Sequence, residues 1–146
     1  MFTPKEVFAK LLKDSRQSVT GARVSVFEAL LGREPMSMHE LVARTNGVDR
    51  ASVYRAVGLF ERLGIVQRLS IGWKYKIELT DRFAEHHHHL TCTACGKTIA
   101  MGEAELESLI AKLAAEHNFT PTAHQIEVQG LCNDCAATTR QVPGRT

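Results

Sequence analysis

The sequence predicts an α+β protein made of two small domains, and three observations support this prediction. Apolar residues recur with helical spacing as far as Gly64 and alternate with polar residues after it. All four cysteines and six of the seven histidines lie beyond residue 80. The length of 146 residues allows one ordinary domain or two small ones, each with an apolar core.

Four amphipathic helices are predicted before Gly64. Each follows a side chain that can accept a hydrogen bond from the first helical turn. Pro4 favours the first helix start, because its fixed φ suits a first turn, and Gly64 ends the fourth helix. The four expected capping residues are Thr3, Thr20, Ser37 and Asp49.

A β-hairpin is predicted after these helices. The segments IVQRLSI and WKYKIEL alternate between apolar and polar residues and flank a turn at Gly72. Short helices followed by a hairpin are typical of a winged helix-turn-helix, in which the helix before the hairpin enters the DNA major groove. We therefore assign residues 1–80 to a winged-helix DNA-binding domain.

The fourth helix has a face suited to nucleic acid. Its apolar residues, among them Val53 and Phe60, gather on one side and leave Tyr54, Arg55 and Arg62 on the other. The first domain holds 13 Lys+Arg against 8 Asp+Glu, which suits an anionic partner. A solvated face with ordinary arginines is the alternative, but the helix–hairpin context and the local charge favour contact with bases and phosphates.

A second domain is predicted after a polar hinge at residues 81–86. We expect strands HHLTC, KTIAM and HQIEVQGLC, with a helix from about Glu103 to His117 before the last strand. These elements form a small α/β domain over residues 87–136, and residues 137–146 are expected to be a flexible tail. From residue 81 onward the chain holds 5 Lys+Arg against 8 Asp+Glu, so its net charge is opposite to that of the first domain.

Two CxxC motifs predict a structural zinc site. Each motif can present two thiolates to one ion, and together they complete a tetrahedral sphere with no position left open for catalysis. Two disulfides or a redox pair are the alternatives, and disulfides would require an oxidising compartment. The four predicted zinc ligands are Cys92, Cys95, Cys132 and Cys135.

The sequence favours a cytoplasmic protein that does not associate with a membrane. No apolar run approaches the roughly 18 residues of a membrane span. The first residues, MFTPKEVFAKLLK, carry lysines through their apolar stretch and no cleavage site follows.

Four consecutive histidines predict further metal binding. The run is internal and precedes a strand, which argues against an expression tag. Alternation in an extended segment sends His86 and His88 to one face and His87 and His89 to the other. Four solvated histidines without a ligand are the alternative.

Each histidine pair has candidate partners elsewhere in the chain. Glu107 and His124 would complete the first pair, as a site of three nitrogens and one oxygen suited to zinc or ferrous iron. Glu78 and Asp81 would offer oxygen ligands to the second pair, which we regard as the weaker site.

Taken together, these motifs resemble the ferric uptake regulator family of bacterial metal-sensing repressors. The resemblance runs from about Val19 to Cys135, and the combination of motifs is specific where each alone is weak. It is carried by TGAR, ASVYRAV, HHHHLTCTACGKTI, Glu107 and AHQIEVQGLCNDC.

The resemblance implies a homodimer that pairs through its C-terminal sheets and binds a palindromic, AT-rich operator of metal-uptake genes. Regulatory metal would close the hinge and fix the spacing of the two recognition helices. By position, Tyr54 and Arg55 would contact bases, Ser52 and Arg23 the DNA backbone, and we expect Arg62 to contact phosphates as well. The cysteines match the structural zinc site of the family, and the cluster of His86, His88, Glu107 and His124 matches a regulatory site.

The sequence departs from the family pattern at the second sensing site. Pro35 and Ala100 stand where the family has a histidine and an acidic ligand, whereas His88 stands where iron sensors commonly have Asp. The histidine is a softer ligand and favours zinc. We expect zinc or ferrous iron as the regulatory metal, ahead of manganese, and peroxide sensing stays open.

Two other functions are compatible with parts of the sequence. The first is a constitutive DNA-binding dimer that holds only structural zinc. The second is a zinc hydrolase with Glu107 as general base. The hydrolase is disfavoured because Glu107 as a fourth ligand would close the metal site, and no nucleophile or oxyanion motif accompanies it. We therefore expect no enzyme.

Overall fold

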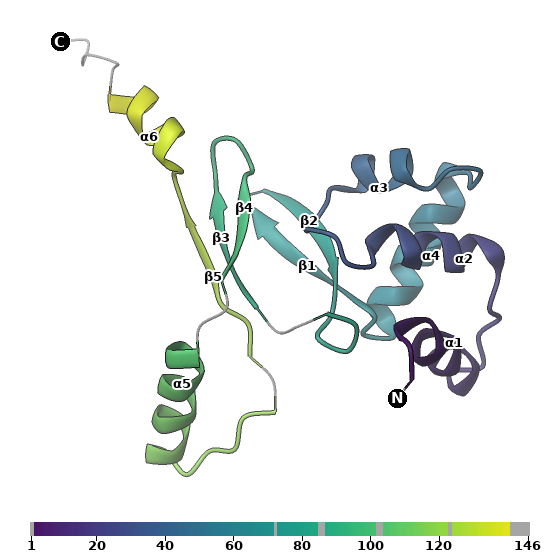
Figure 1. Cartoon of the computed structure of the whole chain (residues 1–146), viewed down its shortest axis with the longest axis horizontal. Coiled ribbons are helices and arrows are strands. Elements are labelled where there is room, and N and C mark those ends of the chain that lie inside the picture. Colours follow the sequence, from purple (N-terminus) through teal and green to yellow (C-terminus); the bar gives the residue numbers. More distant parts are fainter. Residues whose placement is uncertain (1, 72, 85–86, 102–103, 123, 141–146) are drawn as a thin grey trace. The chain divides into compact units, whose positions relative to one another are not determined.

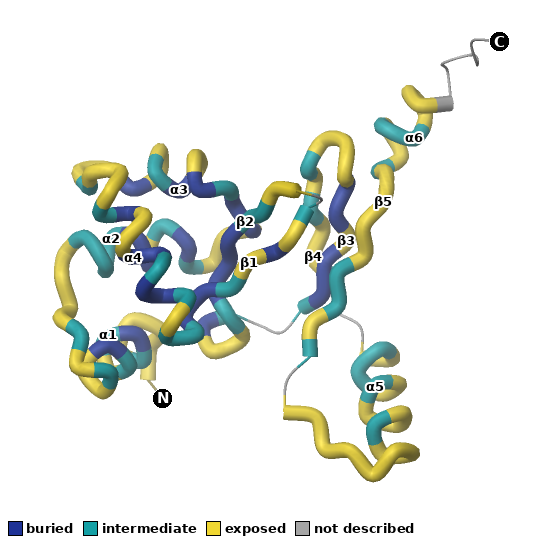
Figure 2. Tube along the Cα trace, turned by 180° about the vertical axis from the view of Figure 1, so that it is seen from behind, coloured by how far each residue is buried: buried dark blue, intermediate teal, exposed yellow. Residues whose placement is uncertain are grey.

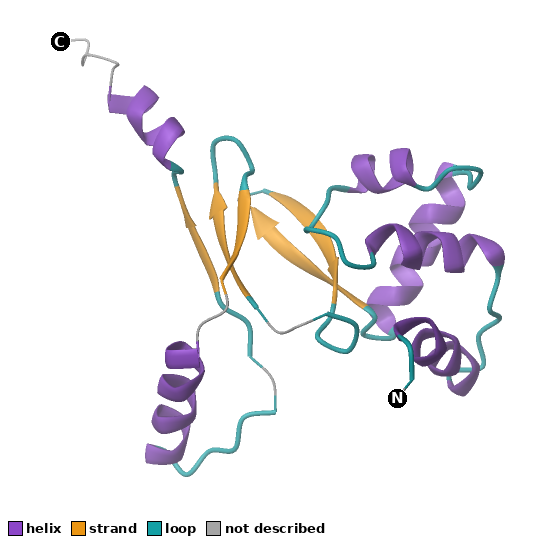
Figure 3. Cartoon of the chain, viewed as in Figure 1, coloured by secondary structure: helices purple, strands orange, loops and turns teal. Residues whose placement is uncertain are grey.

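The computed structural model describes residues 2–71, 73–84, 87–101, 104–122 and 124–140 (Figure 1). The chain divides into two compact units, Met1–Glu85 and His86–Thr146. The first unit is mainly helical and ends in a hairpin, whereas the second combines a sheet with helices (Figure 3).

The first unit is the predicted winged helix-turn-helix. The side chains of all four expected capping residues accept a hydrogen bond from the N–H three residues later, which confirms the predicted helix starts. Its elements are α1 (Pro4–Asp14), α2 (Gly21–Leu30), α3 (Met38–Arg44), α4 (Arg50–Arg62), β1 (Val66–Ile71) and β2 (Lys74–Leu79).

The hairpin has the predicted antiparallel pairing, with Val66 opposite Leu79 and Ile71 opposite Lys74. A short bridge joins it to the segment before α3. Met36 and Ile77 exchange backbone hydrogen bonds of 3.0 and 2.7 Å. The hairpin is therefore held against the helices by main-chain contacts as well as by side chains.

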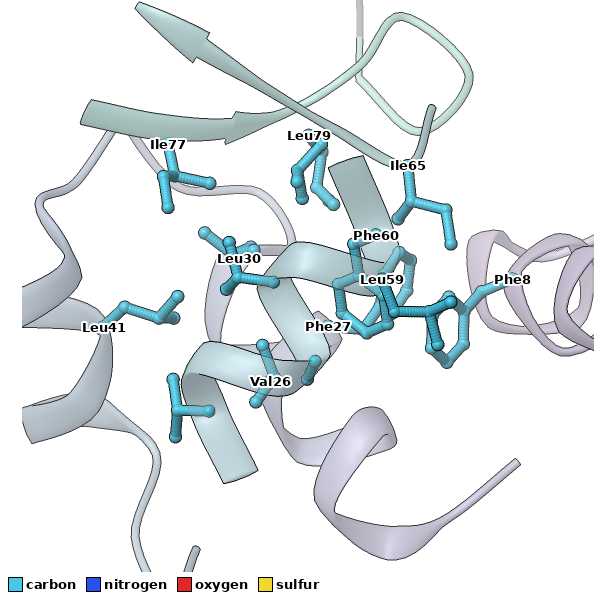
Figure 4. Close-up of a cluster of buried hydrophobic side chains, with 14 of the residues drawn as sticks. Phe8, Val26, Phe27, Leu30, Leu41, Leu59, Phe60, Ile65, Ile77 and Leu79 are labelled. Atoms are coloured by element: carbon cyan, nitrogen blue, oxygen red, sulfur yellow. The ribbon is translucent and has the colours of Figure 1, made fainter. Parts of the chain in front are cut away.

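Aromatic rings form the centre of the first core (Figure 4). The ring of Phe8 stacks on Phe27 at 4.2 Å and meets Phe60 edge-on at 5.3 Å. Burial of these rings joins α1, α2 and α4, and each ring contributes about 2–3 kcal/mol as an upper estimate. This core fixes the outer face of α4.

The segment expected to be a hinge begins inside the first unit. Phe83 is buried, and its ring meets that of Phe27 edge-on at 5.1 Å. Thr80 donates its hydroxyl hydrogen to the carbonyl oxygen of Gly64 at 2.8 Å. Residues 80–83 are thus packed onto the winged helix, a role that their polar neighbours concealed in the sequence.

The second unit is built on the central strand β3 (His88–Cys92). It pairs antiparallel with β4 (Thr98–Met101) and parallel with β5 (Glu127–Gly130). Helix α5 (Ala104–Glu116) lies between β4 and β5 in the chain. A parallel pair requires such a crossover connection, and α5 supplies it.

The end of the chain differs from the sequence prediction. Helix α6 covers Asn133–Arg140, so the first residues of the expected tail over 137–146 are helical as far as Arg140. Nothing between Cys132 and Arg140 breaks a helix, and the N–H of Ala136 donates to the carbonyl of Cys132 at 2.9 Å. Strand β5 is shorter than the predicted HQIEVQGLC segment.

The two units differ in how deeply their side chains are buried. Figure 2 shows a buried interior in the first unit and mostly exposed residues along α5, β5 and α6. No residue of α5 is buried. Among the described residues, no helix is long and apolar enough to cross a membrane.

Candidate metal centres and DNA interface

The four cysteines lie together as a tetrathiolate cluster. Their sulfur atoms all lie within 4.8 Å of one another, and the sulfurs of Cys95 and Cys132 are 3.8 Å apart. A tetrahedral zinc ion with Zn–S bonds of about 2.3 Å separates its sulfurs by about 3.8 Å. None of the four forms a disulfide. The cluster therefore fits the structural zinc that the two CxxC motifs predicted.

The thiols of this cluster differ strongly in acidity. Backbone hydrogen bonding from Cys132, followed by that from Cys95, lowers the pKa of Cys92 to about 6. Hydrogen bonding with the side chain of Cys132, and then with those of Cys95 and Cys92, raises the pKa of Cys135 to about 12. Four thiols so close together release their protons unequally, because each thiolate disfavours the next. A divalent cation compensates this repulsion.

A second cluster joins His88, Glu107 and His124. Both imidazoles approach the same carboxylate oxygen, with Nε2 of His88 at 2.9 Å and Nε2 of His124 at 3.0 Å from Oε1 of Glu107. The three ligand atoms lie within 4.8 Å of one another. His88 is buried, whereas the other two are partly exposed, so the cluster opens towards the surface. His86, the predicted fourth ligand, lies outside the described residues.

The alternation predicted for the histidine run is present in the second unit. His89 lies on the opposite side of β3 from His88, and its ring lies 4.7 Å from that of His87. Ala100 pairs with His89 across the sheet. The imidazoles of His87 and His89 thus form the pair that the sequence predicted.

The acidic partners expected for this pair belong to the first unit. Glu78 is buried in β2 and accepts a hydrogen bond of 2.7 Å from Nε2 of Gln67, its cross-strand neighbour. Asp81 is exposed in the turn after β2. The weaker site of His87, His89, Glu78 and Asp81 stays a prediction.

The start of α4 carries the predicted DNA-contacting residues. Asp49 caps the helix, accepting hydrogen bonds from the N–H and the hydroxyl of Ser52 at 2.9 and 2.6 Å. These bonds, the hydroxyl one first, lower the pKa of Asp49. The Ser52 oxygen in turn accepts a 2.8 Å hydrogen bond from Nη2 of Arg55. Hydrogen bonds from Asp49 to Ser52 and from Ser52 to Arg55 therefore hold the Arg55 guanidinium at the exposed face of α4.

Two further basic residues lie beside this face. Arg23 donates from Nη1 to the carbonyl of Ser18 at 2.5 Å, which ties the start of α2 to the preceding loop. Arg62 is exposed in the last turn of α4. Tyr54 is 41% exposed, which leaves its phenol available to an external partner.

Some residues that shape the interface were not singled out from the sequence. Arg50 lies over the ring of Tyr54 at 5.5 Å, and the i, i+4 spacing could have indicated this pair. Arg68 of β1 binds Glu61 of α4 and lies 4.2 Å from the Tyr75 ring centroid. That hydrogen bond raises the pKa of Arg68. The contact between Arg68 and Glu61 links the hairpin to α4, and it could not be predicted without the tertiary fold.

The fold and its sites define a class of protein. A winged helix-turn-helix that is combined with thiolate and imidazole–carboxylate clusters is typical of a metal-responsive transcription regulator. Comparison with known proteins leads to the same class. The model of the ferric uptake regulator family matches residues 18–129.

Relatives and solved structures agree with this match. The ferric uptake regulation protein of Neisseria meningitidis is 30% identical over 132 residues, 86% of this chain and 91% of the relative. The zinc uptake regulation protein of Mycobacterium tuberculosis is 35% identical over 105 residues, 70% of this chain and 79% of the relative. The crystal structure of the Vibrio cholerae ferric uptake regulator superposes with a TM-score of 0.70 at 29% identity, covering 85% and 98% of the two chains.

This chain belongs to the ferric uptake regulator family. The α+β fold with its N-terminal winged helix is thereby confirmed, as is the assignment to metal-responsive regulators over a constitutive DNA-binding protein. Zinc, iron and manganese are the metals of this family's members, and the four-cysteine cluster provides for structural zinc.

Proposed function

We propose that this chain forms a cytoplasmic homodimer that represses metal-uptake genes when its regulatory site holds zinc or ferrous iron. The observation that carries the proposal is the convergence of His88, Glu107 and His124. These residues come from β3, α5 and the segment before β5, so a shared ion would crosslink three separate parts of one unit.

The second unit has apolar surface that suits pairing with another copy. Leu90, Ile99 and Val128 are 38–47% exposed and line a hollow of about 230 Å³ on the sheet. Leu109 and Leu113 are about half exposed on α5. Exposed apolar side chains gathered in this way are typical of a protein interface.

The outer face of α4 would contact the operator. Tyr54 and Arg55, both on α4, would bind base edges in the major groove, while Ser52, Arg23 and Arg62 would bind the backbone. Two copies related by a twofold axis would present two such helices to a palindrome, with half-sites about 34 Å apart or at a related spacing.

The regulatory ion would be held by His88, Glu107 and His124, with His86 as the expected fourth ligand. It would supply the positive charge that compensates the Glu107 carboxylate between two imidazoles. Metal binding would then favour the arrangement of the two units that binds DNA, and such coupling is typically ~1–3 kcal/mol. His87, His89, Glu78 and Asp81 would form a second, weaker site.

Metal titration tests the proposal. Protein purified anaerobically is analysed for metal per chain, and binding to a palindrome selected from random DNA is measured as zinc, ferrous iron or manganese is added. We expect more than one metal per chain and DNA binding that one metal switches on. A single tightly held zinc with DNA binding indifferent to added metal would instead support the constitutive dimer.

The proposed protein is a regulator without catalytic activity. The imidazole–carboxylate cluster uses Glu107 as a shared partner of both histidines, which leaves it occupied rather than free to act as a base. Hydrolysis of ester or phosphoester substrates by the zinc-loaded protein, lost in Glu107→Gln, would contradict this part of the proposal.

A further inference from the structure

The turn that joins α3 to α4 contains the dipeptide Asn46-Gly47 (Figure 1). Both residues are exposed, and Gly47 has a positive φ of 77°. Glycine suits this place, because L side chains rarely adopt a positive φ. The turn comes directly before Asp49, the residue that caps α4. A chemical change at Asn46 would therefore occur next to the start of the helix that carries the predicted DNA contacts.

The structure leaves the Asn46 amide open to attack by the backbone nitrogen of Gly47. Within the part of the chain that the structure describes, no residue forms a hydrogen bond with the Asn46 side chain, and none accepts one from the Gly47 N–H. Apart from the chain neighbours, no heavy atom lies within 4 Å of the position that a Cβ of residue 47 would take. A backbone nitrogen with no hydrogen-bond acceptor and no side chain beside it is the nucleophile that cyclisation of asparagine requires.

The other two asparagines of the chain lack this combination. Asn118 is also exposed and also has a positive φ, of 54°. The next residue, however, is Phe119, whose side chain crowds its nitrogen and whose N–H donates to the carbonyl of Ala114 at 2.8 Å. Asn133 is the first residue of α6, where the helical conformation fixes its backbone. The fold therefore exposes Asn46, rather than the other two, to cyclisation.

We propose that Asn46 is a site of spontaneous deamidation, which converts the neutral turn before α4 into an anionic one. The Gly47 nitrogen gives up its proton to water, and its electron pair forms a bond to the side-chain carbonyl carbon of Asn46. The side-chain nitrogen takes up a proton and leaves as ammonia, so that a succinimide ring remains. Water then opens either C–N bond of the ring, and a carboxylate forms.

The two ring openings give different products. One gives an aspartate at position 46, and the other gives isoaspartate, in which the main chain runs through the former side-chain carbonyl and is one methylene longer. One water molecule is consumed in forming the ring-opened acid and one ammonia is released, so the reaction needs no oxidant and no other co-reactant. The product carries a full negative charge at neutral pH, because a carboxyl group of this kind has a pKa near 4.

The new carboxylate would oppose DNA binding, and this part of the inference rests on the proposed function. In a helix-turn-helix the N-terminal residues of the recognition helix contact base edges, so the turn that leads into that helix lies close to the duplex. A negative charge there repels phosphate groups within a Debye length of about 10 Å. We therefore expect deamidation to weaken binding to the palindrome and to random DNA alike. The loss is irreversible and accumulates with the age of the protein.

Ageing of the full metal-loaded chain tests the modification. The protein is kept for several days at physiological temperature and neutral pH and is then digested, with freshly purified protein digested in parallel. Mass spectrometry should find an acid in place of the amide at residue 46, whereas Asn118 and Asn133 keep their amides. A methyltransferase specific for isoaspartate should label the same peptide. An amide that survives at residue 46, or that is lost no faster there than at the other two asparagines, would overturn the inference.

Asn46→Asp isolates the effect of the charge, and Asn46→Gln is its matched control. Glutamine keeps the amide, but its longer side chain forms the corresponding ring far more slowly. Fluorescence anisotropy should show that Asn46→Asp binds both DNAs severalfold more weakly than Asn46→Gln does, by a factor that shrinks as salt increases. Aged wild-type chain should lose affinity in proportion to the acid formed at residue 46, whereas aged Asn46→Gln should not.

The two measurements separate the possible failures. Equal affinities of Asn46→Asp and Asn46→Gln, with no loss in the aged wild-type chain, would overturn the effect on DNA. Failure of the fresh wild-type chain to bind any DNA would overturn the proposed function. The modification itself would still be tested, because mass spectrometry detects it without DNA.

Discussion

The Nε2 atom of His88 lies 2.9 Å from Oε1 of Glu107, although 19 residues separate them in the chain. The same oxygen lies 3.0 Å from His124, 17 residues further on. One carboxylate therefore joins the central strand of the second unit, its helix and the segment that leads into β5. Binding of an ion at this point would stabilise all three together.

Glu107→Gln tests this relationship. The amide keeps the shape of the side chain but removes the charge that a cation requires, so the affinity for the second metal per chain should fall by more than about tenfold. The structural zinc should be retained. Competition titration with a chromogenic chelator measures both, and Glu105→Gln, exposed on the same helix, is the matched control. Equal affinities in the two variants would contradict a ligand role for Glu107.

Cys95→Ser tests the tetrathiolate cluster. Loss of one thiolate from sulfurs 3.8 Å apart should release the zinc and lower the free energy of unfolding of the second unit, because structural zinc contributes folding energy directly. Zinc content and the near-ultraviolet and far-ultraviolet circular dichroism of the purified protein measure this. Ser108→Ala, on α5, serves as the control. A folded dimer that contains no zinc would contradict the structural role.

The first unit was predictable because its signals are local. A cap such as Asp49 and the residues it serves lie within one helical turn, and the alternation around Gly72 determines the hairpin. Phe83 was missed because its partner, Phe27, is distant in the chain and its neighbours are polar. Helix α6 was missed because the last residues of a domain commonly fray, so this segment was expected to be a flexible tail.

The candidate sites were predictable in part. The alternation of the histidines is enough by itself to separate His88 from His89, and Glu107 on the predicted helix and His124 at the start of the last predicted strand were candidate partners before the family resemblance agreed with that choice. The position of Arg23 beside Arg55 and Arg62 could not be predicted, because it depends on the packing of α2 on α4.

Arg55→Ala and Arg62→Ala should affect DNA binding differently. Arg55, held by the Ser52 oxygen at 2.8 Å, should account for about 1–3 kcal/mol of discrimination between the palindrome and random DNA. Arg62 should contribute equally to the affinity for the palindrome and for random DNA. Fluorescence anisotropy at fixed salt measures the four affinities. Equal losses on both DNAs in Arg55→Ala would argue against base contact by this residue.

Asp49→Asn should remove part of the acid sensitivity of the first unit. Hydrogen bonds from Ser52 lower the pKa of Asp49 below its ordinary value of 3.8, so its ionised form favours the folded chain. The free energy of unfolding that Asp49 adds relative to Asn should therefore be fully present above the ordinary pKa. It should vanish as the pH falls through the lower pKa of the folded state. Denaturant unfolding followed by helical circular dichroism between pH 3 and 7 measures the difference between the two proteins.

Comparison of the wild-type chain with Asp49→Asn isolates the contribution of this carboxylate to the free energy of unfolding. Protonation of the cysteines at low pH occurs in both proteins and cancels in the difference, since the two sites share no partners. Asp49→Ser provides a second uncharged cap and should show the same pH dependence as Asn. A difference that stays constant from pH 7 to pH 3 would mean that the carboxylate charge contributes nothing beyond capping. If the difference in free energy of unfolding between the two proteins shrinks only on acidification, the charge of the Asp49 carboxylate stabilises the start of α4 through its hydrogen bonds with Ser52.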